Sequence, residues 1–432
     1  MKPAFAHFHR HHTHAGHGHT SGSEETASDT TGAGAQNVGR RQALKLGAVG
    51  AAAAVATTVG TKAAAAQTVV GAFQQQEYGP TDGAHTNDMF DVDAVLGGAW
   101  DVSPYGIGDQ RGTFNELTAE RTSAALKILN RGQPVKTYQL GEEMFNGFPA
   151  FPSDPPRTHN MHLYVFGYEA PAGFVQGGGI QSGIEPLGPN LVSGHEERFE
   201  QNFTFQIATQ IDGLNHIGVG EVYYGGFRGP QIASPTGTTA LGNETMGPVT
   251  ARGVIYDVVG LKVAQGKTED YFMAGSNPVL RDDYHVTLSD LNACLRRQQV
   301  NQVGAGDIPI LHTGWTHLAR IDPTRYLTQE PGIYLAEARY FAERKVAFVA
   351  SDTWGLEVLS PEITGGNAFP VHQELIVKNG VRIGESFVTD SAIADHCYEG
   401  VLIATPENVP GATCGSMAPA FMGQPGRKPR DV

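Results

Sequence analysis

One short segment of the chain holds a carboxylate and an imidazole at a spacing that suits metal chemistry. Asp212 and His216 stand four residues apart, and Gln206 and Gln210 precede them at the same spacing. Carboxylate oxygen and imidazole nitrogen together bind Zn²⁺, whereas Mg²⁺ and Mn²⁺ favour oxygen. Glutamine offers a neutral carbonyl oxygen, which suits a hydrogen bond to water or substrate better than a metal bond. An Asp and a His at this spacing are common, so the pair alone does not predict a metal site.

The segment around this pair resembles a known metal-binding signature. Residues 206–216 are similar to the pattern His-x-Gly-Thr-His-x-Asp-x-Pro-x-His of the cyclase family, which includes kynurenine formamidase and isatin hydrolase. Asp212 and His216 match the family's ligand Asp and last ligand His, while Gln206 and Gln210 replace its first two ligand histidines. Some members bind two metals, and the first two ligand histidines serve chiefly one of them. Because Gln206 and Gln210 replace those histidines, the resemblance implies a site for only one metal here. The pattern Gln-x-x-Thr-Gln-x-Asp-Gly is itself similar to a variant found among the long members.

Later blocks resemble the same family in the same order and extend the resemblance over most of residues 96–425. The chain contains GDIPILHTGW, SDT, PVH and IGE, in that sequence. In this alignment His372 matches a family His near the metal, and Glu385 matches a ligand Glu. Taken alone, His372 could be a hydrogen-bonded core histidine and Glu385 a surface charge. The resemblance implies one divalent metal, Zn or Mn, held by Asp212, His216, His372 and Glu385.

This ligand set implies a hydrolase in which the metal activates water and polarises a carbonyl group. His372 or Glu385 would transfer the proton to the leaving group, and Gln206 and Gln210 would contact substrate or water. The predicted substrate is a small cyclic or aromatic amide or lactone, so the enzyme would act on non-peptide C–N bonds or on lactone esters. Two alternatives stay open: a lyase or cyclase using the same metal, and a small-molecule binding protein without metal. The chain has no G-x-S-x-G nucleophile elbow, which argues against a serine hydrolase.

The elements that must position these residues alternate between strands and helices, which favours an α/β fold. The resemblance implies a swivelling β/β/α fold, with mixed sheets and outer helices. Thr118 is placed to cap a helix with an apolar stripe that includes Ala124, Ala125, Ile128 and Leu129. The remaining patterns predict helices at 289–297 and 335–344, and strands at 137–140, 203–211, 252–259, 307–314 and 346–350.

Composition limits the other function classes. The chain has 432 residues, of which 40% are hydrophobic, and it can therefore bury a sizeable core. Its formal net charge is −14 and it has no block rich in Lys or Arg, so nucleic-acid binding is not expected. Its three cysteines lack CxxC spacing, which argues against a thiolate zinc site and allows at most one disulfide.

The N-terminal segment predicts export. Residues 40–45 read RRQALK, which resembles a twin-arginine motif, and an alanine-rich apolar run at 46–60 follows. Ala64-Ala65-Ala66 resembles a cleavage site, so the mature protein would be periplasmic or extracellular after passage through the twin-arginine machinery. Seven histidines between residues 7 and 19 could bind metal weakly, although a disordered leader is the simpler interpretation. A disordered alanine-rich tail is the alternative for the whole segment.

The sequence predicts four parts of the chain. Residues 1–66 form the signal segment with its His-rich leader, and residues 67–95 form a lead-in arm. Residues 96–425 form the cyclase-like domain, and residues 426–432 form a tail. The resemblance also implies a homo-oligomer that acts on a small-molecule substrate.

Overall fold

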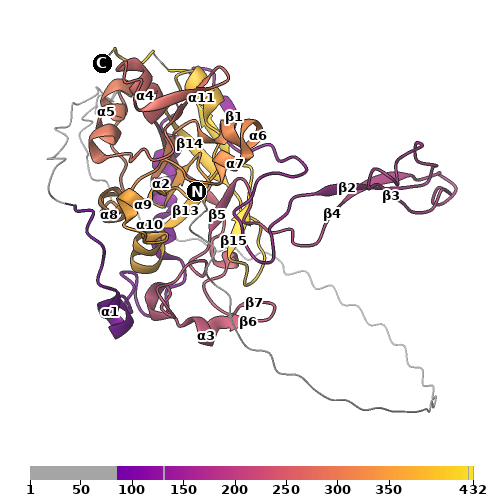
Figure 1. Ribbon diagram of the computed structural model, residues 1–432, viewed down its shortest axis with the longest axis horizontal. Coiled ribbons are helices and arrows are strands. Elements are labelled where there is room, and N and C mark those ends of the chain that lie inside the picture. Colours follow the sequence, from indigo (N-terminus) through magenta and orange to yellow (C-terminus); the bar gives the residue numbers. More distant parts are fainter. Residues whose placement is uncertain (1–84, 130–131, 427, 432) are drawn as a thin grey trace, which may run out of the picture. The chain divides into compact units, whose positions relative to one another are not determined.

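The computed structural model describes residues 85–129, 132–426 and 428–431 of the chain. The His-rich leader and the export signal predicted from the sequence lie outside these residues. The main feature is a nine-stranded mixed sheet, part of which is visible in Figure 1. Its strands, in spatial order, are β1 (Lys136–Gln139), β16 (Ala420–Gly423), β14 (Glu399–Ala404), β8 (Val249–Asp257), β11 (Ile308–His312), β12 (Phe348–Ser351), β13 (Arg382–Glu385), β5 (Gln210–Asp212) and β15 (Cys414–Ser416).

The centre of the sheet is parallel and its flanks are antiparallel. Strands β8, β11, β12 and β13 run parallel, while β14, β16 and β1 on one side and β5 and β15 on the other are antiparallel to their neighbours. Every residue of β11, β12 and β13 is buried. Continuous apolar runs such as the predicted strand at 346–350 are typical of parallel strands covered on both faces. The predicted α/β class with a mixed sheet is therefore confirmed.

Helices connect the strands and pack against the sheet, with α2 and α5 against β8 and α4 against β11. Thr118 caps α2 as predicted, because its hydroxyl accepts a hydrogen bond from the Arg121 amide. Thr287 and Asp290 form a capping box at the start of α5. The α-helices are α1 (Val92–Ala94), α2 (Ala119–Leu126), α3 (Gly229–Ile232), α4 (Val258–Ala264), α5 (Leu288–Gln298), α6 (Leu318–Ile321), α7 (Pro323–Tyr326), α8 (Leu335–Glu343), α9 (Pro361–Thr364), α10 (Pro370–His372) and α11 (Asp390–Ala394).

Three sequence-based predictions of secondary structure are wrong in detail. The helix capped by Thr118 ends at Leu126, so Ile128 and Leu129 lie in the turn that follows. The predicted strand at 203–211 is extended only from Gln210, because residues 205–209 form bends and Ala208 has a left-handed φ of 59°. The predicted strand at 252–259 ends at Asp257, whose side chain caps α4 through the Gly260 amide.

Three smaller sheets complete the described chain. One contains β2 (Met161–Phe166), β3 (Ile180–Gln181) and β4 (Gly194–Phe199), whose residues are mostly exposed, and it forms the slender ribbon in Figure 1. The other two are the pairs β9 (Tyr271–Ala274) with β10 (Asn277–Leu280), and β6 (Ala233–Ser234) with β7 (Gly237–Thr238). All three cysteines are buried and free, so the disulfide that the sequence allowed is absent. None of the helices in the described part has the length and apolar character needed to cross a bilayer.

Candidate metal centre

Three of the residues predicted to bind metal meet where β5 and β13 lie side by side in the large sheet. Asp212 ends β5, Glu385 ends β13, and the pairing of the two strands sets Glu385 opposite Gln210. His372, in the short helix α10, reaches the same point. One ligand atom from each of Asp212, His372 and Glu385 lies within 4.8 Å of the others. In the part of the chain that the structure describes, this is the one group of three such residues close enough to share an ion.

The orientation of His372 is fixed from behind by Glu357. The carboxylate of Glu357 lies 2.6 Å from Nδ1 of His372 and also accepts hydrogen bonds from the backbone amides of Val371 and His372. Nε2 of His372 therefore faces the centre, 3.6 Å from Asp212 Oδ2 and 3.5 Å from Glu385 Oε1. A carboxylate on the far nitrogen of a histidine is a common support for metal ligation, because it fixes the tautomer.

Excess buried negative charge supports a cation at this point. Asp212 is fully buried, and neither of its oxygens makes a hydrogen bond of good geometry in the described chain, although Oδ2 lies 3.6 Å from Nε2 of His372. Burial, reinforced by nearby Glu385 and opposed by His216, raises the pKa of Asp212 to about 6. Burial also raises the pKa of Glu330 well above its usual range, again reinforced by Glu385.

An uncompensated buried carboxylate costs several kcal/mol, so such groups need protons or a cation. The centre sets four carboxyl groups, those of Asp212, Glu330, Glu357 and Glu385, against the imidazoles of His372 and His216. Catalytic zinc sites use three protein ligands and leave one position open, and carboxylate oxygen and imidazole nitrogen are both zinc donors. The residues present therefore fit a divalent cation.

The two glutamines that replace histidines in the signature form a hydrogen-bonded chain beside this centre. Gln210 Nε2 donates to Glu385 Oε2 at 2.6 Å and to Gln206 Oε1 at 2.8 Å. Gln206 Nε2 in turn lies 3.1 Å from Nδ1 of His216. Ala208, with its left-handed φ, lies in the bend between Gln206 and Gln210.

His216, predicted as a fourth ligand, lies beside the group of three. Its ring centre is 6.4 Å from that of His372, and its Nδ1 faces the Gln206 amide. Burial lowers the pKa of His216, although the nearby Asp212 carboxylate opposes this effect. The structure thus gathers all six predicted residues in one place and separates three mutual neighbours from a flanking His216–Gln206–Gln210 chain.

Sequence reasoning missed Glu357 and Glu330. Both are fully buried, and neither belongs to a block that the family resemblance assigned to the metal site. Glu357 interrupts the apolar run at 356–359, and an acidic residue inside such a run was the available signal. Glu330 has no comparable signal. Its Oε2 accepts a hydrogen bond from the Trp354 amide, and its Oε1 has no partner in the described chain.

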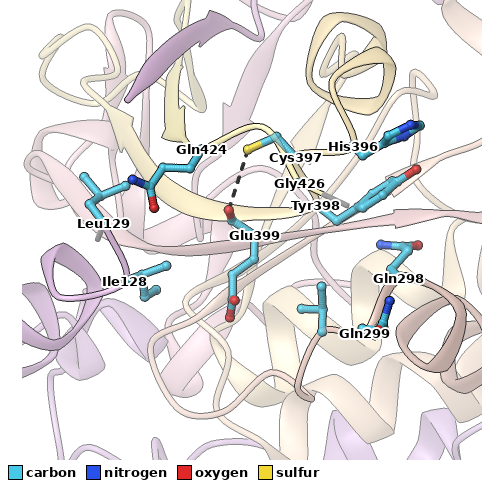
Figure 2. A pocket seen from close by; sticks show the side chains of 11 residues that line it. Ile128, Leu129, Gln298, Gln299, His396, Cys397, Tyr398, Glu399, Gln424 and Gly426 are labelled. Atoms are coloured by element: carbon cyan, nitrogen blue, oxygen red, sulfur yellow. Dashed lines mark hydrogen bonds between the residues drawn. The ribbon is translucent and has the colours of Figure 1, made fainter. Parts of the chain in front are cut away.

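A cavity of about 280 Å³ lies elsewhere and contains none of these residues (Figure 2). Figure 2 shows the Cys397 thiol directed at the backbone of Glu399, and its Sγ donates to the carbonyl oxygen at 3.7 Å. Burial raises the pKa of Cys397 to about 11, so this thiol is not a nucleophile at neutral pH. The metal centre remains the stronger candidate for chemistry.

Fold and site together define a mixed α/β protein with a buried Asp–His–Glu centre. The family model described as "Putative cyclase" matches residues 137–358. The chain belongs to this cyclase family.

One solved structure has the same fold as this chain, and two others are similar over a comparable length. A structure described as a novel cyclase is 28% identical, with a TM-score of 0.57, and the match covers 74% of this chain and 98% of that one. An isatin hydrolase bound to thioisatinate is 17% identical, with a TM-score of 0.45, over 71% of this chain and 99% of that one. Isatin hydrolase A from Ralstonia solanacearum is 15% identical, with a TM-score of 0.44, over 67% and 92%. No curated protein sequence matches the chain.

Proposed function

We propose that this protein is a metal-dependent hydrolase of a small cyclic or aromatic amide or lactone. The observation that supports this most strongly is the fully buried Asp212 carboxylate, whose two oxygens have no hydrogen-bond partner in the described chain. One of them lies 3.6 Å from Nε2 of His372, which is itself 3.5 Å from Oε1 of Glu385. Asp212, His372 and Glu385 would hold one Zn²⁺ or Mn²⁺. When bound, such an ion lowers the pKa of water and polarises a carbonyl group.

Other contacts of these residues orient the side chains and provide a group for proton transfer. Glu357 holds His372 in one tautomer, and Gln210 fixes one oxygen of Glu385 while the other faces His372. Asp212 and His372 side chains are 0% and 3% exposed, whereas that of Glu385 is 10% exposed. Glu385 is therefore the most accessible of the three, and we assign to it the transfer of the proton from water to the leaving nitrogen or oxygen. His372, with its far nitrogen bound to Glu357, would mainly hold its position.

A partly exposed aromatic wall next to His372 supports a ring-containing substrate. The Phe369 ring lies edge-on to His372, with ring centres 5.2 Å apart. Phe151 lies 5.8 Å from Phe369 and 5.3 Å from Trp354 between ring centres. All three aromatic side chains are intermediate in exposure, so they are accessible to a ligand. Flat rings of this kind bind a planar ring by offset or edge-to-face packing.

The direct test is acid release from a panel of aryl formamides, cyclic amides and lactones. The purified full chain would be supplied with Zn²⁺ or Mn²⁺, and proton release and products would be measured for wild type and Glu385→Gln. The exposed Glu362→Gln variant provides a control with the same change in charge. We expect acid release in wild type and Glu362→Gln, and a loss of at least about 100-fold in Glu385→Gln. Equal rates in all three proteins would contradict the proposal.

A lyase or cyclase that uses the same centre is the second candidate, since the chain belongs to a family named for cyclases. Product analysis separates the two, because hydrolysis adds water and creates a new titratable acid. A binding protein without metal is the third candidate. The unpartnered Asp212 oxygens oppose it, because a site that had lost its ion would gain by replacing a buried carboxylate.

We also propose that the protein is exported through the twin-arginine route and assembles as a homo-oligomer. Export is supported by the RRQALK motif at 40–45 and is tested by replacing both arginines with lysine and locating the product. Retention of the variant inside the cell is expected. Exposed apolar side chains on the ribbon, among them Leu163, Ile180 and Phe199, support self-association. Light scattering of the purified chain would measure it, and a monomer would contradict the proposal.

A further inference from the structure

Three hydrogen bonds join Glu385 to His216 in one direction. Gln210 Nε2 donates to Glu385 at 2.6 Å and to Gln206 Oε1 at 2.8 Å, and Gln206 Nε2 lies 3.1 Å from His216 Nδ1. Gln206 and Gln210 are buried, so bulk water does not substitute for these partners. Each of the three hydrogen bonds between Glu385 and His216 therefore has a defined donor and acceptor.

The direction of this chain follows from what each group can do. The Gln210 amide nitrogen faces Glu385 and donates to its Oε2. The second hydrogen of that nitrogen goes to Gln206 Oε1, which leaves the Gln206 amide nitrogen facing His216. An amide nitrogen only donates, so Nδ1 of His216 must accept. A neutral imidazole that accepts at Nδ1 has its hydrogen on Nε2.

This tautomer leaves the His216 ring without a lone pair for a metal. Nδ1 uses its lone pair to accept from Gln206, and Nε2 has the hydrogen. The ring is partly exposed, and within the described residues no hydrogen bond reaches its Nε2. A backbone hydrogen bond from His216 to the Gly213 carbonyl, at 3.1 Å, holds the turn that presents this ring. Within the described residues His216 Nε2–H thus has no hydrogen-bond acceptor, and the His216 ring centre lies 6.4 Å from that of His372.

We infer that Gln206 and Gln210 are positioning residues that hold His216 in the Nε2–H tautomer, so that His216 donates a hydrogen bond to a substrate oxygen instead of binding the metal. This assignment of His216 rests on the proposed function. The substrate oxygen is a carbonyl oxygen that gains negative charge as water adds, and a donor placed there stabilises that charge. A substrate with a protonated amine at this point would be excluded, because Nε2–H cannot accept.

The effect of Gln206 and Gln210 on the His216 tautomer is tested by ¹⁵N NMR of the histidine side chains in the full-length protein. The His216 signals are assigned by their absence in His216→Asn. In wild type we expect an unprotonated Nδ1 and a protonated Nε2. Gln206→Glu keeps an acceptor for Gln210 but presents His216 with an acceptor in place of a donor. The spectrum is recorded at a pH high enough that the His216 signals no longer change with pH. Under that condition we expect the ring hydrogen of His216 to lie on Nδ1 in Gln206→Glu. Gln373→Glu, at a residue whose amide contacts the Gly218 carbonyl, is the matched change in charge and should leave the tautomer unchanged.

The donor role is tested by comparing His216→Gln with His216→Asn. A Gln amide can place an N–H near the position of Nε2, whereas an Asn amide falls near Nδ1, so hydrolysis should survive better in His216→Gln by about tenfold. Both variants should bind as much metal as wild type. Protonated Nδ1 in wild type, an unchanged tautomer in Gln206→Glu, or metal loss in both His216 variants would each overturn the inference. If wild type binds no metal, the proposed function fails. The NMR result still decides whether the hydrogen bonds through Gln210 and Gln206 set the tautomer of His216.

Discussion

Glu357 lies 2.6 Å from Nδ1 of His372 and directs Nε2 of that ring toward Asp212. The same carboxylate accepts from the amides of Val371 and His372, so it fixes the position of the helix start as well as the ring. One buried acid thus sets both the backbone position and the ring orientation of His372.

Replacing Glu357 should therefore weaken metal binding without removing a ligand. The change Glu357→Gln keeps the shape of the side chain but weakens the hold on His372 Nδ1, and supporting residues of this kind typically contribute 10- to 100-fold in affinity. We expect a loss of about that size, measured by competition with a chelator of known affinity. Glu362→Gln, at an exposed site, should bind metal like wild type. Equal affinity in Glu357→Gln would show that His372 needs no support.

The raised pKa of Asp212 predicts how the metal-free protein responds to pH. A carboxyl group whose pKa moves from 3.8 in the unfolded chain to about 6 in the folded chain contributes up to roughly 3 kcal/mol of stability. That contribution is complete below the unfolded pKa, and it is lost as pH rises through the folded value. We therefore expect chelator-treated wild type to lose more free energy of unfolding between about pH 4 and pH 7 than Asp212→Asn.

Urea unfolding at both pH values measures this difference, and other titrating groups cancel in the comparison. Identical pH dependence in the two proteins would mean that Asp212 is not forced to hold a proton in the folded, metal-free state. Adding the metal should remove the pH effect above pH 6 in wild type only, because a bound cation compensates the ionised carboxylate.

The aromatic wall predicts a separation between substrate binding and metal binding. Phe151→Ala should raise KM for an aromatic substrate by about tenfold, the equivalent of roughly 1.4 kcal/mol of ring packing, with metal content unchanged. Met273→Ala, at an exposed position of β9, is the control and should leave KM unaltered. An unchanged KM in Phe151→Ala would remove the structural support for a ring-containing substrate.

Two glycines with similar backbone angles should respond differently to an added methyl group. Gly314 has φ of 81°, and a Cβ there would lie 2.3 Å from the Pro278 carbonyl oxygen. Gly366 has φ of 84°, with no atom within 4 Å of a Cβ. Gly366→Ala should cost about 1 kcal/mol for the left-handed backbone alone, and Gly314→Ala at least about 3 kcal/mol because backbone atoms must also move. Equal costs from urea unfolding would contradict the close packing after β11.

Much of the fold could be predicted from local pattern. The apolar runs at 307–314 and 346–350 are the parallel strands β11 and β12, and the periodic segments at 289–297 and 335–344 are α5 and α8. These elements are buried on one or both faces, so their periodicity records the packing directly. The strand predicted at 203–211 was wrong because alternation cannot reveal the left-handed Ala208 that bends the chain.

The candidate site could be predicted only in part. Asp212, His372 and Glu385 come from segments far apart in the chain. The family resemblance predicts them from the sequence, and they lie together in the structure. Glu357 and Glu330 could not be assigned from sequence, because their role arises from burial against His372 and Glu385. The order of donors and acceptors through Gln206 and Gln210 likewise depends on side-chain placement, which residue spacing does not specify.

The most direct test of the central claim is elemental analysis of the purified full-length protein, with its Asp212→Ala and Gln206→Ala variants, after equilibration with Zn²⁺ or Mn²⁺. Because the N-terminal histidines could bind metal weakly, loosely held ions would first be removed with a mild chelator. We expect about one ion per chain in wild type, a similar amount in Gln206→Ala, and none in Asp212→Ala. No retained metal in wild type, or equal losses in the two variants, would contradict a single-metal centre built on Asp212, His372 and Glu385.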